Sequence, residues 1–174
     1  MAFLATSSGL APRPARRDGR AGVAVALVLA AAAAMAAEPE LLPAEQAFRF
    51  SARALDDRTL EARFTVADGY YLYRDKLKFA VEPEAAGVAT PPLPPGKVKD
   101  DAFFGQVETF RGEVVAKLPL AKGTPGQSLV LVADSQGCAD IGVCYPVNRQ
   151  KVTVVLPAAG KGPGAWRIGV GACR

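Results

Sequence analysis

Hydrophobic side chains recur at every second position through much of residues 48–157. This period is typical of strands that bury one face, and it differs from the period of an amphipathic helix. The alternating or β-branched runs lie at residues 48–52, 59–66, 76–83, 113–120, 128–134 and 151–157. Turn-forming sequences rich in glycine, proline and aspartate separate these runs. The pattern therefore predicts an all-β protein, and short strands at this spacing favour a β-sandwich.

The chain is long enough for one domain with its own core, because it has 174 residues and 50% of them are hydrophobic. We place this domain at residues 38–157. The one helical candidate within it is a turn at residues 43–48. Residues 158–174 are rich in glycine and follow neither period, so we expect them to form an unstructured tail.

The first 36 residues have the features of an export signal. Basic residues up to Arg20 precede an apolar stretch at residues 21–37, and the sequence AMA at residues 34–36 fits a signal peptidase site. We predict a cleavable signal peptide at residues 1–36 and a mature protein in the periplasm, where disulfides can form. The alternative is a retained membrane anchor, because about 17 apolar residues are at the lower limit for a membrane span.

Composition excludes several classes of function. The net charge is +4, but four arginines and one aspartate in residues 1–36 carry +3 of it. A nucleic-acid-binding domain needs a clustered basic face in its folded part, so we expect no nucleic-acid partner. The chain has no histidine, and its two methionines are Met1 and Met35. These absences exclude a Ser-His-Asp triad, histidine-ligated metals and a Met-rich copper site. We therefore expect no cofactor and no bound metal.

Cys138 and Cys144 are the residues best suited to chemistry. They lie in the sequence GCADIGVCYP at residues 137–146, where glycines and a proline indicate a surface loop or hairpin. A disulfide across so short a loop restricts the unfolded chain by only about 2.4 kcal/mol, against about 4.7 kcal/mol for a 100-residue loop. The pair is a weak cross-link and hence a candidate redox site, although a short structural disulfide remains the alternative. Cys173 lies in the predicted tail, which makes a cysteine metal site the least favoured choice.

Four segments resemble the N-terminal periplasmic domain of the DsbD family of thiol:disulfide interchange proteins, in the same order and at similar spacing. They are LPAEQAFRF (42–50), DGYYLYRDKLKF (68–79), DDAFFGQVETFR (100–111) and the cysteine segment GCADIGVCYP (137–146). Together these segments cover about residues 41–157. The motifs that contain the cysteines and the tyrosines are long and unusual, so the resemblance favours a redox function.

The resemblance implies an immunoglobulin-like β-sandwich with the cysteine pair at one end. The domain would act as a protein-disulfide reductase, in which Cys144 forms mixed disulfides with partners and Cys138 resolves them. Electrons would come from a thioredoxin-like domain similar to the C-terminal domain of DsbD, itself supplied by a membrane domain. They would leave to a DsbC-like disulfide isomerase and a CcmG-like cytochrome c maturation protein. The domain alone would be an incomplete reductase. The alternative is a non-catalytic exported binding module with a structural disulfide.

The resemblance also assigns five residues to the surroundings of the pair. Phe103 belongs to a cap loop and would cover the disulfide until a partner displaces it. Phe104 follows it in this loop, but we expect its side chain to lie in the core. Tyr71 and Tyr73 would lie near the pair, on one face of a strand. Asp101 would disfavour a nearby thiolate and so slow unwanted exchange.

Overall fold

The computed structural model describes residues 40–89, 91–102 and 104–171. The predicted signal peptide at residues 1–36, Phe103 of the cap loop and Cys173 lie outside the described residues. Within the described part, no helix is long and apolar enough to cross a membrane. The alternatives of a cleaved signal and a retained anchor therefore concern residues that the structure does not describe.

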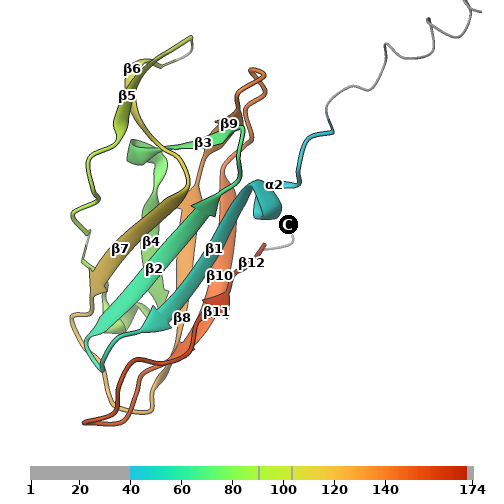
Figure 1. Ribbon diagram of the computed structural model, residues 1–174. Coiled ribbons are helices and arrows are strands. Elements are labelled where there is room, and N and C mark those ends of the chain that lie inside the picture. The colour runs from blue at the N-terminus through green and yellow to red at the C-terminus, as the bar shows by residue number, and fades with distance from the viewer. Residues whose placement is uncertain (1–39, 90, 103, 172–174) are drawn as a thin grey trace, which may run out of the picture. The chain divides into compact units, whose positions relative to one another are not determined.

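The described residues form an all-β structure with three antiparallel sheets (Figure 1). The first sheet has the order β11-β1-β2-β7, with β11 (Arg167–Ile168), β1 (Phe48–Ala54), β2 (Thr59–Val66) and β7 (Glu113–Pro119). The second has the order β12-β10-β8-β4, with β12 (Val170–Gly171), β10 (Asn148–Val155), β8 (Ser128–Ser135) and β4 (Lys78–Glu82). The third has the order β5-β6-β3-β9, with β5 (Lys97–Asp101), β6 (Gly105–Phe110), β3 (Tyr70–Tyr73) and β9 (Gly137–Ala139). The described helices are α2 (Ala44–Ala47) and the 3-10 turns η1 (Arg74–Lys76) and η2 (Glu84–Ala86).

The first two sheets form an immunoglobulin-like β-sandwich, and their inward side chains share one hydrophobic core. In β1, Phe48 and Phe50 are fully buried while Arg49 between them is exposed. Phe50 packs on Phe64 of β2, with the ring centroids 5.0 Å apart. All six alternating runs of the sequence form strands of these two sheets, and the short helix α2 forms within residues 43–48. The predicted all-β fold is therefore confirmed.

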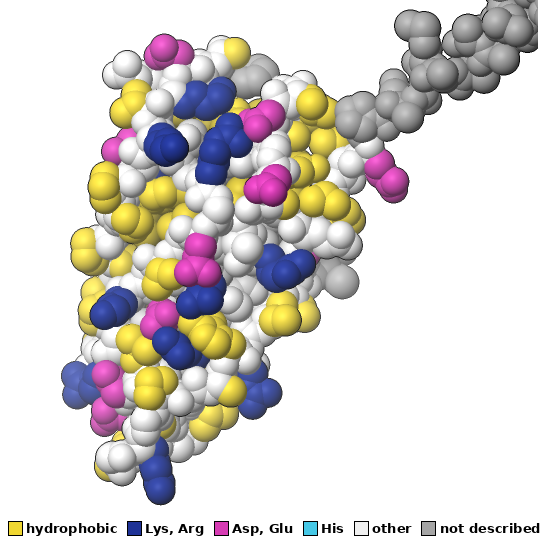
Figure 2. Space-filling model, in the orientation of Figure 1, with side chains coloured by type: hydrophobic (Ala, Val, Ile, Leu, Met, Phe, Trp, Pro, Cys, Tyr) yellow, Lys and Arg dark blue, Asp and Glu magenta, His cyan; other side chains and the backbone are white. Residues whose placement is uncertain are grey.

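Paired charges cover the outer face of the first sheet. Arg53 and Glu61 lie directly opposite each other on β1 and β2, and a nitrogen and an oxygen of the pair are 3.1 Å apart. Arg63 pairs with Glu113 of β7 at 3.2 Å. Figure 2, in which β1, β2 and β7 face the viewer, shows basic and acidic side chains interspersed with apolar ones. Opposite charges on neighbouring strands favour this register of the sheet.

For residues 158–171, the described part of the predicted C-terminal tail, the prediction of an unstructured segment is wrong. β11 pairs with β1 and β12 pairs with β10, so this segment adds an edge strand to each sheet of the sandwich. The ring of Trp166 contacts the guanidinium groups of Arg53 and Arg63, at 4.6 and 4.1 Å from the ring centroid. The sequence pattern did not predict these strands because backbone pairing needs no side-chain alternation. The segment also packs closely: a Cβ atom at Gly169 would lie 2.8 Å from the Phe50 ring. Glycine in this segment thus permits close approach to β1.

The third sheet lies at one end of the sandwich and positions the cysteine pair. Its strands lack a clear alternation, because all four residues of β3 are buried and β5 has the mostly charged sequence KVKDD. β3 pairs with β9 in a register that places Tyr71 opposite Cys138. β3 also pairs with β6, and β5 and β6 form a hairpin that extends beyond the sandwich (Figure 1). The sheet therefore brings the cysteine segment and the predicted cap loop to the same end.

Candidate functional site

Cys138 and Cys144 form a disulfide across a tight hairpin. Cys138 lies in β9, and Cys144 faces it as an antiparallel bridge partner with the Cα atoms 3.9 Å apart. Two backbone hydrogen bonds flank the disulfide, from Ala139 N–H to Val143 O (2.8 Å) and from Tyr145 N–H to Gly137 O (2.9 Å). The turn contains Gly142 with a φ of 89°, a conformation that favours glycine. The local sequence therefore builds a hairpin that holds both sulfur atoms together.

The two cysteines differ in their access to solvent. Cys138 is 0% exposed, whereas Cys144 belongs to the exposed residues of the hairpin. Cys138 packs with Tyr71, Tyr73 and Val107 in a small cluster that is separate from the main core. A thiolate arriving from solvent can therefore reach the sulfur of Cys144 more easily than that of Cys138. Attack on Cys144 would release Cys138 as the leaving sulfur.

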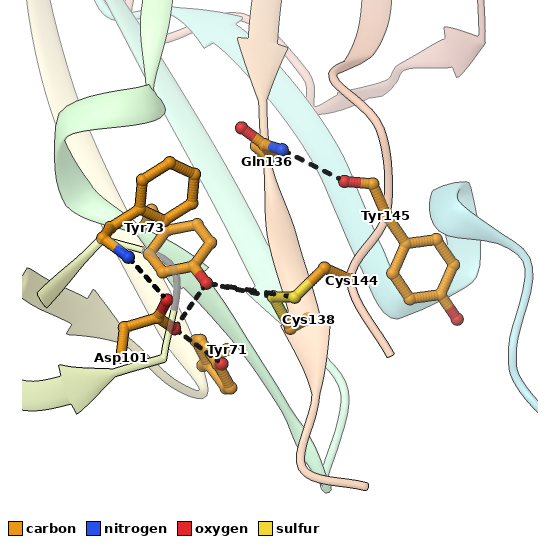
Figure 3. The surroundings of a disulfide bond; sticks show 8 residues. Tyr71, Tyr73, Asp101, Gln136, Cys138, Cys144 and Tyr145 are labelled. Atoms are coloured by element: carbon orange, nitrogen blue, oxygen red, sulfur yellow. Dashed lines mark hydrogen bonds between the residues drawn. A yellow bond between two sulfur atoms is a disulfide. The ribbon is translucent and has the colours of Figure 1, made fainter. Parts of the chain in front are cut away.

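Tyr73 lies against the sulfur atoms from the inner side. Its hydroxyl oxygen is 3.2 Å from Cys138 Sγ and 4.0 Å from Cys144 Sγ. The same hydroxyl donates to Asp101 Oδ2 at 2.7 Å. Burial, followed by the hydrogen bond to Asp101 and by Tyr71, raises the pKa of Tyr73 well above its usual value. The hydroxyl therefore stays protonated and joins the carboxylate to the disulfide (Figure 3).

Asp101 is a buried carboxylate at the end of β5, with 8% of its surface exposed. It accepts hydrogen bonds from Tyr73 and, at 3.4 Å, from the hydroxyl of Tyr71. Its other oxygen accepts from the backbone N–H of Phe104 at 3.2 Å. Tyr71 and Tyr73 thus point to the same side of β3, toward Asp101 (Figure 3). A negative charge held here disfavours a second negative charge on a nearby sulfur.

Phe104 does not lie in the core, and that prediction is wrong. Its side chain is 48% exposed and packs edge-on against Tyr73, with the ring centroids 5.3 Å apart. The Lys76 ammonium lies 4.7 Å from the centroid of the Phe104 ring. The side chain of Phe104 lies outside the core because Phe104 is at the tip of the β5–β6 hairpin, which extends beyond the sandwich. The structure therefore places Phe104 over Tyr73, while Phe103 lies outside the described residues.

An ion pair between Arg111 and Asp140 is the part of the site that sequence reasoning missed. The Arg111 guanidinium donates to both oxygens of Asp140, at 2.9 and 2.5 Å, and also to the carbonyl of Tyr70 at 3.1 Å. These hydrogen bonds hold the pKa of Asp140 below its usual value. The pair fastens the turn of the disulfide hairpin to β3. The two residues lie 29 positions apart in separate motifs, and the local sequence around each gives no signal for the other.

The described end of the molecule combines sulfur, phenol and carboxylate groups. Among the described residues, no group of three or more histidine, cysteine, aspartate or glutamate side chains could hold a metal ion. What the described end of the molecule offers is a disulfide with one exposed sulfur, a protonated tyrosine and a buried carboxylate. These features define a class, the β-sandwich domains that carry an accessible disulfide at one end.

The chain belongs to the DsbD N-terminal domain family. Residues 38–156 match the family described as thiol:disulfide interchange protein DsbD, N-terminal. The thiol:disulfide interchange protein DsbD of Ralstonia nicotianae is 42% identical over 153 residues, which are 87% of this chain and 25% of that protein. DsbD 2 of Pseudomonas aeruginosa is 40% identical over 131 residues, which are 75% of this chain and 20% of that protein. The chain thus spans a quarter or less of the length of these two curated relatives.

Two solved structures from Neisseria meningitidis share the fold. The crystal structure of the DsbD N-terminal domain in the reduced form has a TM-score of 0.61 and 35% identity, and the match covers 71% of this chain and 94% of that chain. The DsbD N-terminal domain in complex with the PilB N-terminal domain has a TM-score of 0.55 and 33% identity, over 72% of this chain and 93% of that chain. The relative in the second structure therefore binds another protein domain.

Proposed function

We propose that this domain exchanges disulfides with thioredoxin-like proteins in the periplasm through Cys138 and Cys144. It would accept electrons from a domain like the C-terminal domain of DsbD, which a membrane domain supplies. It would pass them to DsbC-like and CcmG-like proteins. The observation that carries this proposal is the unequal exposure of the two sulfur atoms, with Cys144 exposed and Cys138 at 0%. A structural disulfide has no need of one exposed sulfur.

The exchange would proceed in two steps. In the reduced domain, the Cys144 thiolate attacks the disulfide of the partner, forms a mixed disulfide and releases one partner sulfur as a thiolate. Cys138 then loses its proton and attacks the Cys144 sulfur, so that the bond from Cys144 to the partner breaks. The partner leaves with two more electrons, and the Cys138–Cys144 disulfide is restored. This is the general course of thiol–disulfide exchange.

Asp101 and the cap loop would limit disulfide exchange to proteins that bind the domain and displace the cap. The buried carboxylate of Asp101, linked to Cys138 Sγ through the Tyr73 hydroxyl, would oppose thiolate formation in the free domain. Phe104 over Tyr73 supports a cap in this position, and we assign Phe103 the covering role. A partner that displaces the cap would expose the pair.

The surface around Cys144 is suited to another protein. Ile141 and Val143 of the hairpin are 58% and 41% exposed, and Phe104 of the neighbouring hairpin is 48% exposed. Exposed apolar side chains on the hairpins at this end of the domain are typical of a protein interaction site. The complex of the relative with a PilB domain supports an interaction with folded protein partners. We propose that the partner contacts these three side chains when its sulfur approaches Cys144.

We place the reaction in the periplasm, reached through the signal peptide at residues 1–36. The disulfide supports an oxidising compartment, because such bonds are rare in the cytosol. A fusion of residues 1–36 to a reporter that is active only after export would test the signal. Cleavage after residue 36, read by mass spectrometry of the mature N-terminus, would distinguish a signal peptide from a retained anchor.

The proposed function is tested by trapping. A Cys138→Ser variant cannot resolve its mixed disulfide, so we expect a covalent adduct through Cys144 with an oxidised thioredoxin-like partner, seen on non-reducing gels and identified by mass spectrometry. The matched control is Cys144→Ser, which retains Cys138, the buried sulfur of the pair, and should form little adduct when Cys173 is replaced by serine in both variants. Absence of an adduct with every thioredoxin-like partner would favour the alternative of a binding module. Equal adducts from both variants would contradict the assigned roles.

A further inference from the structure

The strand segment that carries Cys144 is held through the next residue, Tyr145. The carbonyl of Tyr145 accepts a hydrogen bond from Gln136 Nε2 at 3.3 Å, and its N–H donates to Gly137 O at 2.9 Å. Successive side chains of an extended segment point to opposite sides. Figure 3 shows the Tyr145 ring directed away from the sulfur atoms. A restraint on this ring therefore acts on Cys144 through a single peptide unit.

The side chain of Tyr145 binds the beginning of the domain. Its hydroxyl donates to the carbonyl of Leu42 at 2.6 Å, while the N–H of Leu42 donates to the hydroxyl of Tyr70 at 2.9 Å. The Tyr145 ring packs edge-on against Phe48, with the centroids 5.4 Å apart. Burial, with the neighbouring Tyr70, raises the pKa of Tyr145 to about 12. The hydroxyl therefore remains a donor at every physiological pH.

We propose that Tyr145 is a positioning residue for disulfide exchange, because its hydrogen bond to Leu42 holds Cys144 beside Cys138 when no bond joins the two sulfurs. This inference rests on the proposed function of the pair. Once the disulfide is broken, Cys144 is restrained by the flanking backbone bonds of the short hairpin, by the Gln136 bond to the Tyr145 carbonyl and by the Tyr145 side chain. A restraint of this kind raises the effective concentration of one sulfur near the other.

The restraint acts on the resolving step. In that step Cys138 loses its proton to solvent and its sulfur attacks Cys144, while the bond from Cys144 to the partner breaks and the electron pair leaves with the partner's sulfur. Loss of the Tyr145 hydrogen bond lowers the time that Cys144 spends within reach of Cys138. The equilibrium then shifts from the disulfide toward the dithiol, and mixed disulfides last longer.

The test compares Tyr145→Phe with Tyr70→Phe. Both variants keep the ring and lose one hydroxyl that binds Leu42, but only Tyr145 is next to a cysteine in the chain. Each protein is equilibrated in glutathione buffers, and its thiols are counted by mass spectrometry after alkylation. We expect the ratio of disulfide to dithiol to fall about two- to tenfold in Tyr145→Phe, the range expected from one neutral hydrogen bond. Tyr70→Phe should change this ratio by less than about twofold.

An unchanged ratio in Tyr145→Phe, or an equal fall in both variants, would overturn the inference. A stability effect alone would lower the melting temperature of both variants without separating their redox ratios. The result is distinguishable from a failure of the proposed function, because the ratio is measured with glutathione alone. If Tyr145→Phe shifts the ratio while no partner is trapped, the positioning role holds and the proposed partners are wrong. If partners are trapped while the ratio is unchanged, the proposed function holds and the positioning role is wrong.

Discussion

Trp166 should stabilise the sandwich although it lies outside the part of the chain that matches the family. Its ring contacts the guanidinium groups of Arg53 and Arg63 at 4.6 and 4.1 Å. Two such contacts, at about 0.5–1 kcal/mol each in exposed positions, contribute about 1–2 kcal/mol. The Arg53–Glu61 pair near this ring is largely buried, with the Glu61 side chain 9% exposed. We therefore expect Trp166→Ala to lower the free energy of unfolding by about 1–2 kcal/mol.

The matched control is Ile168→Ala in the same segment. Ile168 lies in β11, pairs with Ser51 through the backbone, and is 70% exposed. Its truncation leaves the strand pairing in place, so the free energy of unfolding should change by less than about 0.5 kcal/mol. Urea denaturation followed by far-ultraviolet circular dichroism measures both variants with the disulfide intact. A loss below about 0.5 kcal/mol in Trp166→Ala would refute the conclusion that this segment is part of the folded domain.

Two further predictions concern charges at the disulfide end. Asp101→Asn should speed the alkylation of the reduced pair by iodoacetamide at neutral pH, because it removes a buried negative charge that opposes a thiolate; an unchanged rate by mass spectrometry would contradict this role. The Arg111–Asp140 pair should add at most about 1 kcal/mol of stability at pH 7, since both side chains are 45% exposed. The lowered pKa of Asp140 means that this contribution is present above about pH 4 and is lost as the pH falls through that pKa. The free energies of unfolding of the wild type and Asp140→Asn should therefore converge in acid. A difference between them that does not depend on pH would show that the ion pair is not its cause.

The sandwich strands were predictable because each of them buries one face. β1 and β2 alternate buried and accessible positions over much of their length, and such alternation is visible in the amino-acid sequence. The sequence did not predict β5. Among the described strands it pairs with β6 alone, and it buries little, so its charged sequence has no periodic pattern. β11 and β12 escaped because their pairing is made by backbone atoms next to glycines. Long-range backbone pairing leaves little trace in the side-chain pattern.

The site also contains residues that the sequence predicted and residues that it did not. The cysteines, Tyr73 and Asp101 were found through motifs that resemble a known family, and the structure brings all of them together. The ion pair between Arg111 and Asp140 joins residues 29 positions apart, and nothing in the local sequence around either residue specifies the other. The sequence prediction placed Phe104 in the core because residue type alone does not distinguish a phenylalanine at a hairpin tip from one in the core. Its exposure depends on where the hairpin lies.

The central claim is that the Cys138–Cys144 disulfide is an exchange centre, and its redox equilibrium tests this claim most directly. The wild-type protein is equilibrated in glutathione buffers of known potential, and its thiols are counted by mass spectrometry after alkylation. A redox carrier should have a potential between about −120 and −270 mV. A potential below about −300 mV, which is typical of structural disulfides, would contradict the account and leave the pair as a cross-link of the hairpin.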